Sequence, residues 1–417
     1  MDIMLTPRPI GGTISTISSK SHGHRLLICA ALSNKETFIS CNHRCDDLEA
    51  TVSCLNALGA RISYEDGGYA VCPIGNPSDD PILDCRESGA TLRFLLPVAA
   101  ALGKSVTFRL NGRLAERPLS PLVDALEAHG CHLFRPDANT LRCSGKLRGG
   151  NFSIPGDVSS QFVSGLLFAL PLIGEDCDIM LTSSVESVGY ISMTLEVLKA
   201  FGIHCTSTDH GWRLKKGQSY QSPGNCIVEG DWSNAAFWLC AGGVSRPVSV
   251  TGLASDSAQG DRLILSILEA FGAQVQWQGS TVTVSPGALH CIDLDVRHIP
   301  DLVPPVALVA SAACGTTVIH GGKRLRNKES DRLVTIAQTL NQLGGQVQVT
   351  DDGLIIHGCP LVGGELSSHN DHRIAMLGAL ASALCPEPVV IHEAQAVNKS
   401  YPHFWKDLKQ LQQEGRL

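Results

Sequence analysis

The sequence predicts an α/β (α+β) protein of two domains, each built from three copies of a βαβαββ unit. A helix-like pattern that ends in glycine recurs every 70 to 72 residues along the 417-residue chain. Two short runs of alternating apolar and polar residues, typical of strands, follow each of the first five glycines. A second, nearly apolar helix pattern precedes each glycine by about forty residues. Six such units account for nearly the whole chain.

The recurring glycines mark the ends of six amphipathic helices. Glycine tolerates a positive φ angle, so it suits the position just after a helix, and we expect that role for all six. They are Gly59, Gly130, Gly202, Gly272, Gly344 and Gly415.

The six earlier helices are apolar all round and should therefore be buried. Each has Ser, Asp, Asn or Glu, the residue types that cap helix N-termini, within its first three residues. The stretch "VEGDWSNAAF" starts the fourth unit, which fits two halves of three units. If two three-unit domains face each other with these helix starts inward, the cleft would attract anions. The helices cover 18–32, 87–102, 157–170, 230–244, 299–312 and 370–384.

Composition limits the class of protein. The chain is 43% hydrophobic and 18% charged, which is typical of a globular protein, and its net charge of −7 argues against a general nucleic-acid binder. The opening "MDIMLTPRPI" lacks the pattern of a signal peptide. The longest apolar stretches are shorter than the ~20 residues of a membrane helix. We expect a cytoplasmic protein.

The sixteen cysteines are scattered and are expected to stay reduced. The stretch "CNHRCDD" (41–47) comes closest to a metal site, but no second pair of ligands follows at a suitable spacing. No metal site is predicted, and the other cysteines are interpreted as small core residues.

Basic side chains recur near the helix starts. A single lysine or arginine there is usually a solvated surface group, and a serine is usually only a cap. When several basic residues recur at the same position in successive repeats, however, they oppose the helix dipoles and need a compensating anion. We therefore predict an anion-binding site that contains Lys20, Arg25, Arg93, Arg113, Arg117, Arg324, Arg326, Lys328, Arg332, Arg373 and Lys399, with the neutral donors Ser159, Ser160, Gln161, Ser187 and Tyr190.

Nine blocks of the chain, in the right order, resemble the 5-enolpyruvylshikimate-3-phosphate synthase family. They are "SSKSHGHRLLI", "ESGATLRF", "RLAERPLSPLVDAL", "DVSSQFVSGLL", "VEGDWSNAAF", "IPDLVP", "RNKESDRL", "NDHRIAM" and "NKSYPHFW". The family fold, two domains of three βαβαββ units with helix N-termini at the interdomain cleft, agrees with the repeat. The resemblance implies a domain of residues 1–17 and 230–417 on the phosphoenolpyruvate side, and a domain of residues 18–229 on the shikimate 3-phosphate side.

The resemblance also implies a reaction. The enolpyruvyl (1-carboxyvinyl) group of phosphoenolpyruvate moves to the 5-hydroxyl of shikimate 3-phosphate, and phosphate is released, in the shikimate pathway to chorismate and the aromatic amino acids. Shikimate 3-phosphate should be bound by Lys20, Ser21, Arg25, Ser159, Ser160, Gln161, Ser187, Tyr190, Asp301 and Lys328. Phosphoenolpyruvate should be bound by Lys20, Gly89, Arg93, Arg117, Gln161, Arg332, Arg373 and Lys399. The implied catalytic residues are Lys20, Asp301 as proton acceptor and Glu329 as proton donor.

Further expectations follow from the family. Its members work as monomers without a metal or organic cofactor, and those with glycine at the position of Gly89 are usually sensitive to glyphosate. Glu87 and Ala90 depart from the residues that many members carry beside it. Two alternatives stay open: the related transferase that acts on UDP-N-acetylglucosamine, and a non-catalytic repeat protein that binds an anionic metabolite. The transferase that acts on UDP-N-acetylglucosamine typically has a cysteine that serves as the acid in one loop. The corresponding loop of this chain reads "RLNGRLAERPLSPL" and contains no cysteine.

Overall fold

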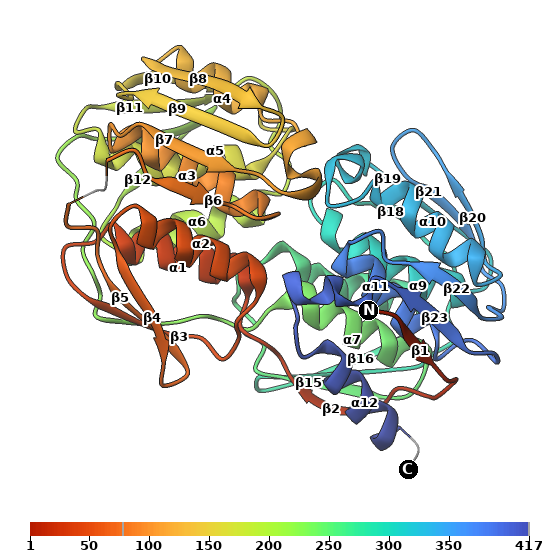
Figure 1. Ribbon diagram of the computed structural model, residues 1–417. Coiled ribbons are helices and arrows are strands. Elements are labelled where there is room, and N and C mark those ends of the chain that lie inside the picture. The colour runs from red at the N-terminus through yellow and green to blue at the C-terminus, as the bar shows by residue number, and fades with distance from the viewer. Residues whose placement is uncertain (77–78, 416–417) are drawn as a thin grey trace. The chain divides into compact units, whose positions relative to one another are not determined.

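A computed structural model describes residues 1–76 and 79–415, which form two compact units (Figure 1). The N/C unit comprises Met1–Ser19 and the chain from Glu229 onward, and the middle unit comprises Lys20–Val228. The family resemblance assigns phosphoenolpyruvate to a domain of residues 1–17 and 230–417, and shikimate 3-phosphate to a domain of residues 18–229. This assignment stays a prediction. No helix among the described residues is long and apolar enough to cross a membrane.

The predicted βαβαββ unit is confirmed and is clearest in repeats two, three and five. In each, the first two strands are parallel, and the second strand pairs antiparallel with the last strand of a hairpin. Repeat two contains β6 (Ile82–Asp84), α3 (Gly89–Ala101), β7 (Val106–Arg109), α4 (Ser120–Glu127), β8 (Cys131–Asp137) and β9 (Thr140–Gly145). Repeat three contains β10 (Gly150–Ile154), α5 (Ser160–Ala169), β11 (Cys177–Leu181), α6 (Val188–Ala200), β12 (Cys205–Thr208) and β13 (Gly211–Leu214). Repeat five contains β18 (Asp293–Asp295), α9 (Val303–Ala312), β19 (Thr316–His320), α10 (Arg332–Gln342), β20 (Gln346–Val349) and β21 (Leu354–His357).

Repeats one and four take their first strand from a distant part of the chain. In repeat one, β14 (Asn225–Ile227) lies parallel to β3. In repeat four, β2 (Gly12–Ser15) lies parallel to β15. The other elements of repeat one are α1 (Lys20–Ala31), β3 (Thr37–Ser40), α2 (Asp46–Ala57), β4 (Arg61–Glu65) and β5 (Gly68–Cys72). Those of repeat four are α7 (Trp232–Val244), β15 (Val248–Thr251), α8 (Ile264–Phe271), β16 (Gln274–Gln278) and β17 (Thr281–Ser285).

Among the residues that the structure describes, repeat six has no hairpin of its own. It consists of β22 (Gly364–Ser367), α11 (His372–Ala381), β23 (Val389–His392) and α12 (Phe404–Glu414). The N-terminal strand β1 (Ile3–Leu5) pairs antiparallel with β23 and takes the hairpin's place. Figure 1 shows β1 and β2, drawn in red, beside the elements of the N/C unit.

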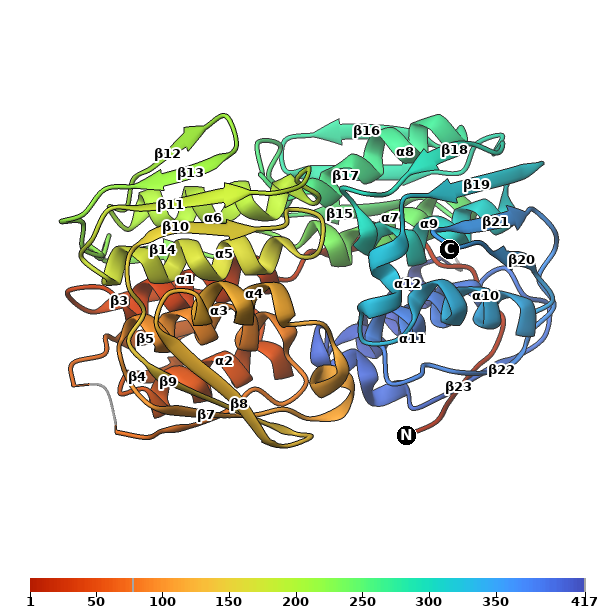
Figure 2. The same cartoon turned by 90° about the horizontal axis from the view of Figure 1, so that it is seen from above.

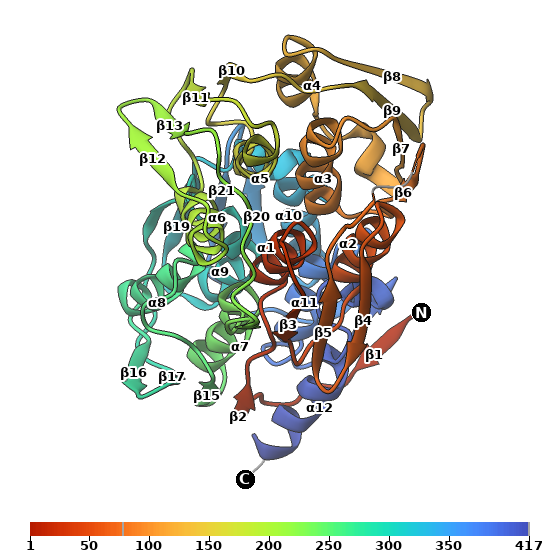
Figure 3. The same ribbon diagram turned by 90° about the vertical axis from the view of Figure 1, so that its left-hand side faces the viewer.

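The apolar helices lie inside each unit, as predicted. In the middle unit, α3 packs against α5, and Figure 3 shows the helices surrounded by the unit's strands. In the N/C unit, α7 and α11 pack against α9, and Figure 2 shows strands β15–β21 along the outside of this core. The helix starts carry the predicted caps in four cases, where the side chains of Ser88, Ser159, Asp231 and Asp371 accept hydrogen bonds from backbone N–H groups of α3, α5, α7 and α11.

Five of the six repeat glycines have the expected positive φ, between 77° and 110°. Gly415 was predicted wrongly, because its φ is −66°. No hairpin follows α12 among the described residues, so the chain needs no left-handed turn there. A Cβ on Gly415 would lie 2.9 Å from both the Gly11 nitrogen and the Pro9 oxygen. Glycine is therefore required there by the close approach of the N-terminal segment.

Gly272→Ala should destabilise the N/C unit by about 2 kcal/mol or more. The residue has φ +98°, and the new Cβ would lie 2.5 Å from the Ala288 oxygen, so a clash is added to left-handed strain. Gly279→Ala is the matched control, because it has φ +61° with no atom within 4 Å, and it should cost about 1 kcal/mol. Urea unfolding of both variants measures the difference. Equal losses would contradict the contact with Ala288.

Candidate active site

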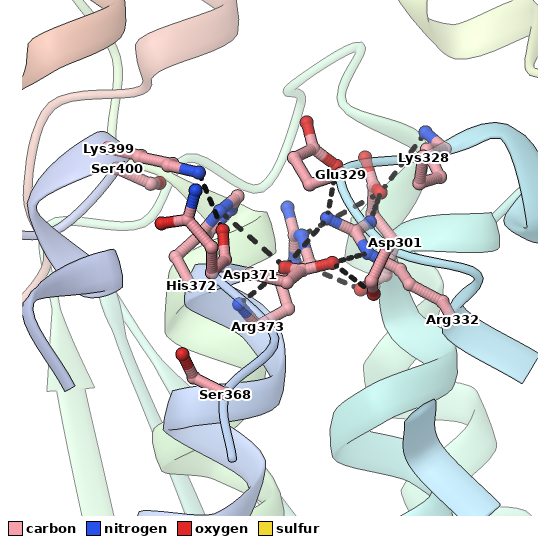
Figure 4. Close-up of polar contacts among 12 residues, drawn as sticks. Asp301, Lys328, Glu329, Arg332, Ser368, Asp371, His372, Arg373, Lys399 and Ser400 are labelled. Atoms are coloured by element: carbon pink, nitrogen blue, oxygen red, sulfur yellow. Dashed lines mark hydrogen bonds and ion pairs between the residues drawn. The ribbon is translucent and has the colours of Figure 1, made fainter. Parts of the chain in front are cut away.

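A buried guanidinium, that of Arg332, organises the charged residues of the N/C unit (Figure 4). Arg332 is the first residue of α10, whose start is capped by Asp331. Its Nη1 donates to Asp301 at 2.7 Å, its Nη2 donates to Glu329 at 2.7 Å, and its Nε donates to Asp371 at 2.8 Å. Burial by itself would lower the pKa of Arg332, but the three carboxylates raise it above its ordinary value. Arg332 therefore stays charged and holds the three acids in fixed positions.

Asp371 joins two helix starts and was not predicted as a site residue. It is fully buried, it accepts from both Nε and Nη2 of Arg332, and it accepts from the Ser330 hydroxyl at 3.0 Å. Its other oxygen caps α11 by accepting from the Arg373 backbone N–H at 3.0 Å. Burial would raise the pKa of Asp371, but the charge of Arg332 outweighs burial and lowers it. The sequence "NDHR" indicated only the cap.

Asp301 lies among three cations. It belongs to a short 3-10 turn, Pro300–Leu302, just before α9. Its Oδ1 accepts from Arg332 and from Lys328, the latter at 3.3 Å, and lies 3.7 Å from Nε of Arg373. Arg373 also donates to the Asp301 backbone oxygen at 3.0 Å. Burial lowers the pKa of Lys328 to about 8, although the charge of Asp301 opposes the shift.

Two further features border this cluster. Lys399 donates to the Asn370 backbone oxygen at 2.5 Å, which places its ammonium group at the start of α11 (Figure 4). Asp261 is buried and accepts from the Ser233 hydroxyl. Burial, and next the charge of Asp301, raise the pKa of Asp261 to about 6. Asp261 was missed by sequence reasoning, which had no pattern to connect it with Asp301.

In the middle unit, the first helix holds three of the predicted ligands, Lys20, Ser21 and Arg25. Lys20 forms an ion pair of 2.7 Å with Asp47. Arg25 is buried and donates to the Ser21 backbone oxygen, the Tyr190 backbone oxygen and the Thr194 hydroxyl at 2.7 to 2.9 Å. Burial lowers the pKa of Arg25 to about 10. Asp47 comes from the stretch "CNHRCDD", which sequence reasoning considered only as a metal site.

The starts of α3, α5 and α6 carry most of the other predicted residues of the middle unit, whereas Arg113 and Arg117 lie in and just after the short 3-10 helix Gly112–Glu116. Arg93 donates to the Gln161 side chain at 2.7 Å, and Gln161 and Ser160 follow the cap Ser159 in α5. Gly89 lies against Arg117, because a Cβ there would be 2.8 Å from Nη1 of Arg117. Ser187 has a left-handed φ of 55° just before α6, the helix that carries Tyr190.

The predicted residues thus form separate groups within the two units. Asp301, Lys328, Glu329, Arg332 and Arg373 come together, with Lys399 nearby. One part of the sequence argument needs correction. Bases near helix starts were expected to need a bound anion, but acids of the chain itself already pair with several of them, Asp47 with Lys20 and Asp301 with Lys328 and Arg332. Within each unit, carboxylates and cations of the chain itself therefore lie together.

Comparison with known proteins identifies the family of this chain. A family model described as EPSP synthase (3-phosphoshikimate 1-carboxyvinyltransferase) matches residues 5–408. The chain is 40% identical over 415 residues to a 3-phosphoshikimate 1-carboxyvinyltransferase of Clostridium kluyveri, with 98% of this chain and 97% of the relative covered. It is 35% identical over 423 residues to the protein of that name in Clostridioides difficile, with the same coverage.

Solved structures show the same fold. The EPSP synthase of Acinetobacter baumannii matches with a TM-score of 0.80 at 23% identity, covering 98% of this chain and 97% of the other. The enolpyruvyl transferase NikO of Streptomyces tendae matches with a TM-score of 0.77 at 19% identity and the same coverage. The family model and the clostridial relatives both span nearly the whole chain, and so the chain belongs to the EPSP synthase family.

Proposed function

We propose that this chain, acting as a monomer, transfers the enolpyruvyl group of phosphoenolpyruvate to the 5-hydroxyl of shikimate 3-phosphate in the route to chorismate and the aromatic amino acids. The products are 5-enolpyruvylshikimate 3-phosphate and phosphate. The observation that carries the residue assignment is the pair of carboxylates, Asp301 and Glu329, held 2.7 Å from opposite nitrogens of Arg332. Lys328 and Arg373 stand beside Asp301.

Both substrates carry a carboxylate and a phosphate, so cations from the helix starts suit them. In this proposal phosphoenolpyruvate contacts Lys20, Gly89, Arg93, Arg117, Gln161, Arg332, Arg373 and Lys399. Shikimate 3-phosphate contacts Lys20, Ser21, Arg25, Ser159, Ser160, Gln161, Ser187, Tyr190, Asp301 and Lys328. Arg332 and Arg373 present planar guanidinium groups, which bind carboxylate or phosphate in a bidentate manner.

The reaction needs two proton transfers, and two carboxylates in different surroundings can perform them. Asp301, next to Lys328, takes the proton of the attacking 5-hydroxyl as the new carbon–oxygen bond forms. Glu329, bound to Arg332, gives a proton to the methylene carbon of phosphoenolpyruvate. Loss of phosphate and of a methyl proton from the tetrahedral intermediate then re-forms the carbon–carbon double bond, which is now part of an enol ether. The fixed cations stabilise the charge that develops during both steps.

Two other functions are less well supported than this transfer reaction. Transfer to UDP-N-acetylglucosamine is disfavoured because the clostridial relatives, which cover 98% of this chain, carry the shikimate enzyme's name. A non-catalytic anion-binding protein would have no need for Asp301 and Glu329 on a single guanidinium.

One assay separates the three functions. The purified protein should release phosphate from phosphoenolpyruvate only when shikimate 3-phosphate is present, and ³¹P NMR should show the enolpyruvyl product. UDP-N-acetylglucosamine in place of shikimate 3-phosphate should give no phosphate. Release with the nucleotide sugar, or with neither acceptor, would refute the proposal.

Asp301→Asn and Glu329→Gln should each lower turnover by roughly 100-fold or more, because each removes one proton-transfer group. Asp331→Asn is the matched control. It removes the same charge from the same segment and keeps a good helix cap, and the Asp331 side chain accepts from Arg326 and from the Val334 N–H rather than from Arg332. Steady-state kinetics should show near-normal turnover for this control. Normal turnover in either of the first two variants would overturn its assigned role.

Shikimate 3-phosphate should bind more weakly above pH 8. The pKa of Lys328 is lowered to about 8 by burial, so its positive charge is present below that pH and is lost as the pH rises. Since the substrate should bind the charged form, its dissociation constant should rise by about tenfold per pH unit above the pKa. Isothermal titration from pH 7 to 9 measures this. Lys328→Arg stays charged and should show no such rise; the same rise in both proteins would exclude Lys328 as its source.

A further inference from the structure

The chain leaves and re-enters the N/C unit at one place. Two segments, 16–19 and 229–232, run antiparallel there and are joined by hydrogen bonds. The Ser19 N–H donates to the Glu229 oxygen at 2.8 Å, and the Asp231 N–H donates to the Ile17 oxygen at 2.9 Å. We call these two segments the connecting ladder. Both chain connections to the middle unit start from it, since Lys20 follows Ser19 and Val228 precedes Glu229.

One buried amide, that of Gln259, binds both segments of the ladder. Its Nε2 donates to the Gly230 oxygen at 2.7 Å. Its Oε1 accepts from the Ser19 hydroxyl at 3.2 Å and from the Trp232 N–H at 3.1 Å. The side chain is 5% exposed, so water does not compete well for these bonds. Gln259 thereby fixes the positions of the two segments relative to each other.

The ladder leads directly to proposed substrate ligands. Ser19 is followed by Lys20, the first residue of α1. Trp232 is the first residue of α7, and two residues later the Asn234 side chain donates to the Ser400 hydroxyl at 3.2 Å, beside Lys399. A change at Gln259 can therefore move the backbone that carries Lys20 and the helix that supports Lys399.

The ladder has little space in which to adapt. A Cβ on Gly230 would lie 2.4 Å from the Gly252 oxygen and 2.5 Å from Cγ2 of Thr16. The Gly230 backbone is therefore confined on the side of Gly252, and its carbonyl is held by Gln259. Loss of the amide would leave the Gly230 oxygen and the Trp232 N–H buried without that partner, which favours local opening of the ladder.

We propose that Gln259 is a positioning residue for enolpyruvyl transfer, which holds Lys20 and the start of α7 in place through its bonds to Ser19, Gly230 and Trp232. The expected loss of transferase activity rests on the proposed function. The expected effect on the ladder rests on the geometry alone. Gln259 touches neither substrate; it acts through the backbone that carries residues which do.

Gln259→Met tests the proposal against Gln412→Met. Methionine keeps the length of the side chain and removes the amide, and Gln412 is a buried glutamine of the same unit, on α12, whose side-chain nitrogen makes no hydrogen bond to the ladder. In Gln259→Met, hydrogen exchange in peptides covering Ser19 and Asp231 should be at least ~10-fold faster. In addition, kcat/KM for phosphoenolpyruvate should fall by roughly 10- to 100-fold, because small displacements of ligands are costly.

The control separates positioning from general destabilisation. Gln412→Met should leave ladder exchange and KM for phosphoenolpyruvate unchanged, even if both variants unfold at the same urea concentration. Identical exchange and kinetics in the two variants would overturn the proposal. If the wild-type protein lacks the transferase activity, the proposed function fails, while the exchange measurement still decides whether Gln259 holds the ladder.

Gln259→Glu provides a reversible version of the test. A protonated glutamic acid can donate to the Gly230 oxygen and accept from Ser19 and Trp232, as the amide does. An ionised one would face that oxygen with a negative charge, and burial together with the nearby acids Asp231 and Asp261 should raise its pKa. The ratio of variant to wild-type kcat/KM should therefore rise at least ~5-fold from pH 8.5 to pH 6. A constant ratio would contradict the proposed bonds.

Discussion

The charged cluster of the N/C unit depends on one interaction, the contact of the buried Arg332 guanidinium with three carboxylates. A buried charge is costly unless it is paired and its hydrogen bonds are satisfied. Arg332 meets both conditions, because Asp301, Glu329 and Asp371 accept from all three of its nitrogens. The planar guanidinium can do this, whereas the compact ammonium group of lysine could not bridge three acids with the same fixed geometry. The two acids proposed for catalysis thus share one positively charged support.

Internal pairing also describes how the site can exist before a substrate arrives. Lys20 is matched by Asp47, and Lys328 and Arg373 lie beside Asp301. Bound carboxylate and phosphate groups would have to compete with these internal acids or join them. In the proposed mechanism, such competition changes the surroundings of Asp301 and Glu329 when the substrates bind, and different surroundings allow two similar carboxylates to take opposite roles in proton transfer.

The sequence predicted what depends on local patterns and missed what depends on distant pairing. The βαβαββ repeat followed from glycine spacing and apolar periodicity. The strand Asn225–Ile227, by contrast, has only three residues, and only its pairing with β3 shows that it belongs to repeat one. The recurring cations were visible because they share one phase of the repeat. Their partners were not, since Asp371 is 39 residues from Arg332 and Thr194 is 169 residues from Arg25. The helix cap alone was enough to explain Asp371 in the sequence, so the pattern did not indicate its second role as a partner of Arg332.

The distant strands that complete repeats one and six set an order for biosynthesis. The middle unit is completed by β14, so a nascent chain can finish it once Val228 has emerged from the ribosome. The N-terminal strand β1, by contrast, pairs with β23 at Val389–His392 and has to wait for nearly the entire polypeptide. At ~5–20 residues per second this delay is on the order of tens of seconds. Throughout that time an unpaired edge strand, with Met4 exposed even in the finished protein, is open to a chaperone or to another nascent chain.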